Sequence, residues 1–128
     1  MENELKEAKD QMKPEVVTDL DVANKLIKLY QSAKDRNIEF DLTLKKVRQL
    51  LQVKTCYYTG VEFDETGPRA RSIDRVDSDQ GYIDDNVVAC TVDINGKKAN
   101  LSNEEIEMLY NKLKQWHKAK AAKKPITE

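Results

Sequence analysis

The 128-residue sequence contains few cysteine, histidine and aromatic residues. Its two cysteines, Cys56 and Cys90, cannot form a disulfide framework, and their apolar neighbours predict reduced, partly buried thiols. The single histidine, His117, lies in a lysine-rich stretch, where an exposed helix residue is expected. A displaced catalytic base is the alternative role for this side chain.

Long apolar runs are also missing. No stretch reaches about 18 apolar residues, so no transmembrane span is expected. The first residues, MENELKEAKDQMK, are charged throughout and lack the apolar core of a signal peptide. The sequence therefore predicts an intracellular protein without membrane contact.

The charge balance excludes a strongly basic protein. The formal net charge is −1, so any contact with nucleic acid must come from a local basic patch. Apolar residues make up 39% and charged residues 35% of the chain, which suits one small domain with helical extensions.

Apolar periodicity predicts two helices in the first half of the chain. Over residues 19–37 apolar residues recur at three- and four-residue steps, behind a cap at Thr18 or Asp19. The buried stripe is expected at Ala23, Leu26, Ile27, Tyr30 and Ala33. A second helix is expected after a cap at Asp41 or Thr43. Its expected inward residues are Leu44, Val47, Leu50 and Leu51.

In the middle of the chain the period changes to two. The stretches ARSIDRV and NVVAC predict a two-stranded antiparallel ribbon around an aspartate-rich loop, in which Gly81 is the expected positive-φ residue. DINGKKANLS predicts a short helical turn that breaks at Gly96. Ser102 and Glu105 then form a capping box for a last helix. The stripe of that helix is expected at Ile106, Leu109, Leu113 and Trp116.

These elements divide the chain into three parts. Residues 1–18 are a charged segment, expected either as a short helix or as a loosely attached, flexible piece. Residues 19–111 form the main domain, and residues 112–128 form a lysine-rich helix end and tail. The lysines of this last part either contact a phosphate backbone or form a solvated helix end.

The order of strand, aspartate-rich loop, strand and short helix can aim several polar side chains at one point. Asp74 offers a hard oxygen ligand for a divalent cation, and Asn95 offers a second oxygen. Asn86 is placed to fix the geometry of the loop, and Lys97 and Lys98 are placed to meet phosphate. The remaining aspartates are expected mainly as turn and cap residues. They are Asp77, Asp79, Asp84 and Asp85.

The segments CYYTG and SIDRVDSDQGYIDDNVV, with the later Asn95, Lys98 and LSNEE, resemble the HNH endonucleases, also called ββα-metal or His-Me finger enzymes. The resemblance is strongest to small phage-encoded members and covers roughly residues 23–110. It implies an α+β fold in which a two-stranded antiparallel ribbon and a short helix form a ββα-metal finger between N-terminal and C-terminal helices. It also implies metal-dependent cleavage or nicking of DNA, with Mg²⁺ or Mn²⁺.

The resemblance assigns roles residue by residue. Asp74 matches the metal-ligand aspartate, and Arg75 stands where the family has its catalytic histidine. Asn86 matches the central asparagine, Asn95 the final histidine or asparagine, and Lys98 the lysine that follows. A guanidinium stays protonated at neutral pH, so Arg75 cannot act as a general base, although it can bind phosphate.

Many members of the family also hold a structural zinc with two Cys-x-x-Cys pairs. Here Thr59 replaces the second cysteine of the pair that begins at Cys56. The other pair would fall at Thr91 and Ile94, one position away from Cys90. One thiolate cannot hold a tetrahedral zinc, so no structural zinc is expected.

Two hypotheses about function follow. The first is a metal-dependent DNA endonuclease or nickase, acting in the cytoplasm of the host cell if it is phage-encoded. Its expected DNA contacts are Arg71, Arg75, Lys97, Lys98, Lys112 and Lys114. The second is a catalytically inactive HNH-like domain that binds a protein partner, for instance a host factor, or binds DNA without cutting.

Overall fold

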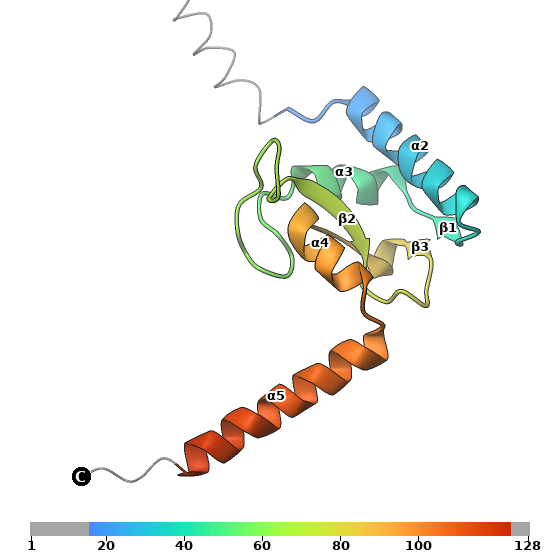
Figure 1. Cartoon of the computed structure of the whole chain (residues 1–128). Helices are drawn as coiled ribbons and strands as arrows, with labels where there is room; N and C mark the ends of the chain where they lie inside the picture. The colour runs from blue at the N-terminus through green and yellow to red at the C-terminus, as the bar shows by residue number, and fades with distance from the viewer. Residues whose placement is uncertain (1–15, 124–128) are drawn as a thin grey trace, which may run out of the picture. The chain divides into compact units, whose positions relative to one another are not determined.

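The computed structural model describes residues 16–123, which form a mixed α+β fold with two small sheets (Figure 1). The elements are α2 (Asp19–Asp35), β1 (Phe40–Asp41), α3 (Leu44–Gln52), β2 (Arg71–Arg75), β3 (Tyr82–Ile83), the 3-10 helix η1 (Asp84–Asn86), β4 (Val87–Thr91), α4 (Val92–Ala99) and α5 (Asn103–Lys123). The α+β class agrees with the sequence prediction. The prediction for residues 1–18 falls almost entirely outside the described residues.

The antiparallel ribbon predicted around the aspartate-rich loop is confirmed. Strands β2 and β4 pair antiparallel, with Ile73 opposite Ala89 at the centre of the register. The loop between them carries a further strand, β3, which pairs parallel with β1 through Phe40 and Tyr82. A strand of two residues has no period to detect, so the sequence did not show this second sheet.

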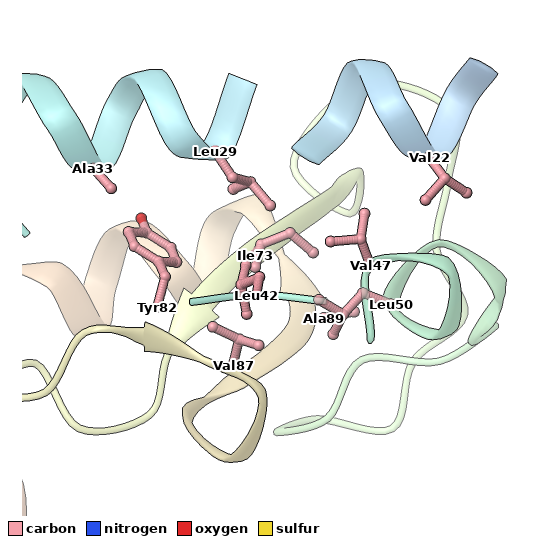
Figure 2. Packing of buried hydrophobic residues seen from close by; sticks show 10 residues of the cluster. All are labelled: Val22, Leu29, Ala33, Leu42, Val47, Leu50, Ile73, Tyr82, Val87 and Ala89. Atoms are coloured by element: carbon pink, nitrogen blue, oxygen red, sulfur yellow. The ribbon is translucent and has the colours of Figure 1, made fainter. Parts of the chain in front are cut away.

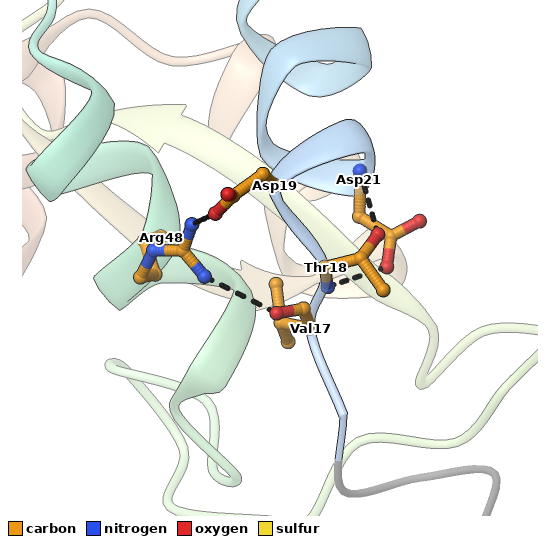
Figure 3. A network of polar contacts seen from close by, with 5 residues as sticks. All are labelled: Val17, Thr18, Asp19, Asp21 and Arg48. Carbon is orange, nitrogen blue, oxygen red and sulfur yellow. Dashed lines mark hydrogen bonds and ion pairs between the residues drawn. The ribbon is translucent and has the colours of Figure 1, made fainter.

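The start of α2 is fixed by polar contacts (Figure 3). Thr18 Oγ1 accepts the backbone N–H of Asp21 at 3.1 Å, and Asp21 Oδ2 accepts the N–H of Thr18 at 3.0 Å, which is a reciprocal capping box. Arg48 of α3 donates to the carbonyl of Val17 and pairs with Asp19. Arg48 therefore joins the beginning of α2 to the middle of α3.

The core lies between α2, α3 and one face of the β2–β4 ribbon (Figure 2). Its buried residues are Val22, Leu29, Ala33, Leu42, Val47, Leu50, Ile73, Tyr82, Val87 and Ala89. Three expected inward residues are wrong, since Ile27 is 52% exposed, Tyr30 49% and Leu44 57%. Apolar residues cover a wide arc of each helix, and only the middle of that arc meets the core. Periodicity alone does not show where the middle lies.

The expected positive φ at Gly81 is also wrong. The glycines with positive φ are Gly60 (+76°) and Gly67 (+85°), both in the connection between α3 and β2. Gly81 is needed for another reason, because an added Cβ would lie 2.5 Å from the carbonyl oxygen of Glu39. The next residue, Tyr82, donates its N–H to that same oxygen at 2.8 Å, so the two backbones must approach closely.

The predicted break at Gly96 does not occur, because α4 continues through this residue to Ala99. A glycine inside a helix costs only about 1 kcal/mol, which the rest of the helix offsets. The chain divides between Asn95 and Gly96 into two compact units. The second unit contains the end of α4 and helix α5.

Helix α5 begins with the predicted capping box. Ser102 Oγ accepts the N–H of Glu105 at 3.0 Å, and Glu105 Oε1 accepts the N–H of Ser102 at 3.0 Å. None of the helices within residues 16–123 combines the length and the apolar character that a membrane crossing requires.

Substitution at Gly81 tests the close approach of β3 to Glu39. We expect Gly81→Ala to lower the free energy of unfolding by about 1–3 kcal/mol, because the new methyl group overlaps backbone atoms that cannot move away. Gly96→Ala is the matched control, since nothing lies within 4 Å of its added Cβ, and it should raise stability by about 0.5–1 kcal/mol. Urea denaturation of both variants measures the difference. Equal effects would contradict the close approach.

Candidate functional site

Asp74 and Asn95 lie on the same face of the β2–β4 ribbon. Side chains alternate along a strand, so Ser72 and Asp74 leave β2 on the face opposite the buried Ile73. Asn95 of α4 donates from Nδ2 to Ser72 Oγ at 2.7 Å. The start of α4 therefore packs on the face that carries Asp74, and Asn95 contacts the residue two positions before Asp74 on β2.

Tyr58 is a site residue that the sequence did not reveal. Its hydroxyl donates to Asp74 Oδ2 at 2.6 Å. Burial raises the pKa of Tyr58, and the hydrogen bond to the Asp74 carboxylate and its negative charge raise it further, so the phenol stays protonated. The preceding residue, Tyr57, donates its N–H to the carbonyl of Ala89, and this contact holds CYYTG against β4. Such a long-range contact has no local sequence signal.

Asn86 closes the loop between β2 and β3. Its side chain is buried, and Nδ2 donates to the carbonyls of Asp77 (3.0 Å) and Gly81 (2.9 Å). Its Oδ1 accepts the N–H of Asp77 at 2.9 Å, and its backbone carbonyl accepts the N–H of Val76 at 2.8 Å. One amide thus holds both ends of the 77–81 segment.

Arg75 extends into the same loop. Its Nη1 donates to the carbonyls of Ser78 (3.0 Å) and Gln80 (2.7 Å). The guanidinium carbon lies 5.5 Å from the centroid of the Tyr82 ring. Strand alternation directs Arg75 to the face opposite Asp74. Arg75 therefore binds the loop backbone.

The aspartates Asp77 and Asp84 act as turn and cap residues, as predicted. Asp77 accepts the N–H of Asp79 at 2.9 Å and the side-chain amide of Gln80 at 3.1 Å. Asp84 accepts the N–H and the hydroxyl of Thr43, at 3.0 and 2.8 Å. Thr43 in turn caps α3, so Asp84 supports the start of that helix.

The residues predicted to contact DNA do not all lie on the ribbon face that carries Asp74. Arg71 donates to the carbonyl of Leu50 at 2.7 Å and lies 4.2 Å over the ring of Phe63. Burial lowers the pKa of Arg71, and its side chain lies on the α3 side of the ribbon. The remaining cations belong to the second unit. They are Lys97 and Lys98 in the last turn of α4, and Lys112 and Lys114 on the exposed surface of α5.

Two of the positions that the resemblance assigns to zinc ligands, Thr59 and Thr91, lie at Cys56. Both cysteines are free and buried. Thr91 Oγ1 lies 3.9 Å from Cys56 Sγ and donates to Asp93 Oδ1 at 2.5 Å. Burial raises the pKa of Cys56. Hydrogen bonds from Thr59 and from backbone groups of Thr91 and Tyr58 outweigh burial and lower the pKa to about 7. Hydrogen-bond donors thus surround this sulfur.

Within residues 16–123 no three histidine, cysteine, aspartate or glutamate side chains are grouped as a metal site. Asp74 and Asn95 offer a smaller set of ligands. Asn95 uses Nδ2 for Ser72, so its Oδ1 is the second oxygen offered on the face that carries Asp74. Two protein oxygens suit Mg²⁺ or Mn²⁺, which keep several water ligands, and do not suit a closed zinc site.

Comparisons with known proteins give one relative. A phage protein described as "Uncharacterized 29.0 kDa protein in dda-modA intergenic region", from Enterobacteria phage T4, is 33% identical over 76 residues. The match covers 59% of this chain and 31% of that protein, so the chain spans about a third of its relative. No family model matches the sequence, and no solved structure matches it.

The Asn86 contacts can be tested by deletion of the amide. Asn86→Ala should lower the free energy of unfolding by about 2–3 kcal/mol, since buried groups of Asp77 and Gly81 lose their partner. The control is Asn111→Ala on the exposed surface of α5, where the change should be within about 0.5 kcal/mol. Urea denaturation measures both variants. A loss below about 0.5 kcal/mol in Asn86→Ala would contradict the role given to this amide.

Proposed function

We propose that the chain is an HNH-like, metal-dependent endonuclease or nickase that acts on DNA. One observation carries the proposal. Asp74 and Asn95 lie on the same face of an antiparallel strand pair that is followed directly by a helix, and the ββα-metal finger has the same order of elements. Two oxygen ligands on one face give a divalent cation room for water and a phosphate oxygen.

Each residue of the proposed site has a distinct role. Asp74 and Asn95 Oδ1 would hold Mg²⁺ or Mn²⁺, which polarises a phosphodiester and lowers the pKa of a bound water. Tyr58 fixes one carboxylate oxygen of Asp74 by its 2.6 Å hydrogen bond. Asn86 orients the loop. Lys97 and Lys98 follow Asn95 on α4 and would contact phosphate, and further backbone contacts are proposed at Lys112 and Lys114.

Two further observations support the family assignment. Thr59 and Thr91 lie around Cys56, as ligands of a lost zinc site would. The relative from phage T4 favours a phage-encoded protein that works in the cytoplasm of a host cell.

Plasmid nicking tests the proposal directly. The purified chain should convert supercoiled plasmid to the nicked form with Mg²⁺ or Mn²⁺ and not with EDTA. Asp74→Ala should lower the rate by more than about 100-fold, because it removes the only charged ligand. Asp35→Ala, an exposed carboxylate at the end of α2, should leave the rate unchanged. Equal rates in wild type and Asp74→Ala would contradict the assignment.

One observation favours a second candidate, an inactive HNH-like domain that binds a protein partner or binds DNA without cutting. Arg75 stands at the position of the catalytic base, and its guanidinium donates to the loop carbonyls of Ser78 and Gln80. A side chain that holds the loop in this way is consistent with a domain that has no catalytic base.

The same plasmid assay separates the two candidates. The inactive domain predicts no nicking by wild type with Mg²⁺ or Mn²⁺, whereas the active enzyme predicts metal-dependent nicking that Asp74→Ala removes. Arg75→His is not expected to restore a base at the metal site, because residue 75 leaves the ribbon on the face opposite Asp74. Nicking by a folded Arg75→His beside an inactive wild type would contradict that geometry.

A further inference from the structure

Helix α5 carries large apolar side chains that nothing in its own unit covers. Leu109, Leu113 and Trp116 are 52%, 57% and 54% exposed. Every residue from 107 to 122 is exposed. Among the described residues, the second unit holds only the end of α4 besides α5, which is too little to cover a helix of 21 residues.

The apolar residues follow the spacing of a helix-pairing seam. Ile106, Leu109, Leu113 and Trp116 are separated by three, four and three residues, which is the a and d pattern of a coiled coil. The next position of the pattern is Lys120, whose ammonium lies 4.7 Å from the Trp116 ring. The seam is therefore short, about two heptads long, and ends at Trp116.

Charge is divided between the two ends of the same helix. The acidic residues of α5 are Glu104, Glu105 and Glu107, all within its first five residues. No acid follows within α5, and its lysines begin at Lys112. The helix is thus acidic at its beginning and basic along the rest of its length.

We propose that α5 pairs in antiparallel orientation with α5 of a second copy of this chain. In the register centred on Asn111, Ile106 lies opposite Trp116 of the second copy, and Leu109 lies opposite Leu113. The same register sets the acidic beginning of each helix beside the lysines of the other. A parallel pair would instead place lysines beside lysines along half of its length, which is unfavourable.

The acidic beginning also distinguishes a second copy from other occupants. A membrane surface or a nucleic acid is anionic and would attract the lysines, but it would repel the three glutamates next to the seam. A partner helix that places cations beside the glutamates and anions beside the lysines pairs favourably with both ends of α5. An antiparallel copy of α5 has this arrangement of charge. The inference does not depend on the proposed nuclease activity.

Sedimentation equilibrium of the full chain tests the pairing, over concentrations from about 10 to about 500 µM because two heptads form a weak dimer. The mean mass should rise from 14.7 kDa toward twice that value. Leu113→Ser should raise the dissociation constant by about tenfold or more. Met108→Ser, equally exposed but outside the seam, should leave it unchanged. A monomer throughout, or equal effects of both variants, would overturn the proposal.

Cysteine cross-linking tests the orientation. Ile106→Cys and Trp116→Cys are prepared separately, mixed and oxidised, while the native thiols remain buried. The antiparallel pair predicts that the disulfide between the two different variants predominates. Predominance of disulfides between identical variants would show a parallel pair and overturn the proposal.

Discussion

The side-chain amide of Asn86 is the contact on which the central part of the molecule depends. It is buried, and it binds both ends of the 77–81 loop through three hydrogen bonds to Asp77 and Gly81. A buried polar group without a hydrogen-bond partner is costly, so these contacts favour one conformation of the loop between β2 and β3. That conformation brings Tyr82 beside Phe40 and aligns Arg75 with the loop carbonyls.

Strand alternation then gives the β2–β4 ribbon two different faces. One face carries Ile73 and Ala89 into the core with α2 and α3, and Arg75 leaves the strand on this side. The other face carries Asp74, with Tyr58 and Asn95 around it. Arg75 and the proposed metal ligand Asp74 are therefore neighbours in sequence with different surroundings. This separation lets Arg75 serve the loop without displacing Asp74.

The sequence predicted what local period and capping chemistry determine. The ribbon, the helices that start at Asp19 and Leu44 and the Ser102 capping box were found, since each depends on residues a few positions apart. Features that depend on distant segments were missed or misjudged: the β1–β3 pair, the tight approach of Gly81 to Glu39, and the Tyr58 contact with Asp74. Asp74, Asn86 and Asn95 were predicted from the order of strand, loop, strand and short helix and from the resemblance, whereas Arg75 was assigned by the resemblance alone.

The central claim is that Asp74 and Asn95 together bind a divalent cation. Titration of the ¹⁵N-labelled chain with Mn²⁺ tests it without any assay of activity, because the paramagnetic ion broadens amide resonances near its site. The account predicts selective broadening around Asp74 and Asn95 at low Mn²⁺, reversed by excess Mg²⁺ and absent in Asp74→Asn. Broadening that is uniform over the acidic surface, or unchanged in Asp74→Asn, would contradict it.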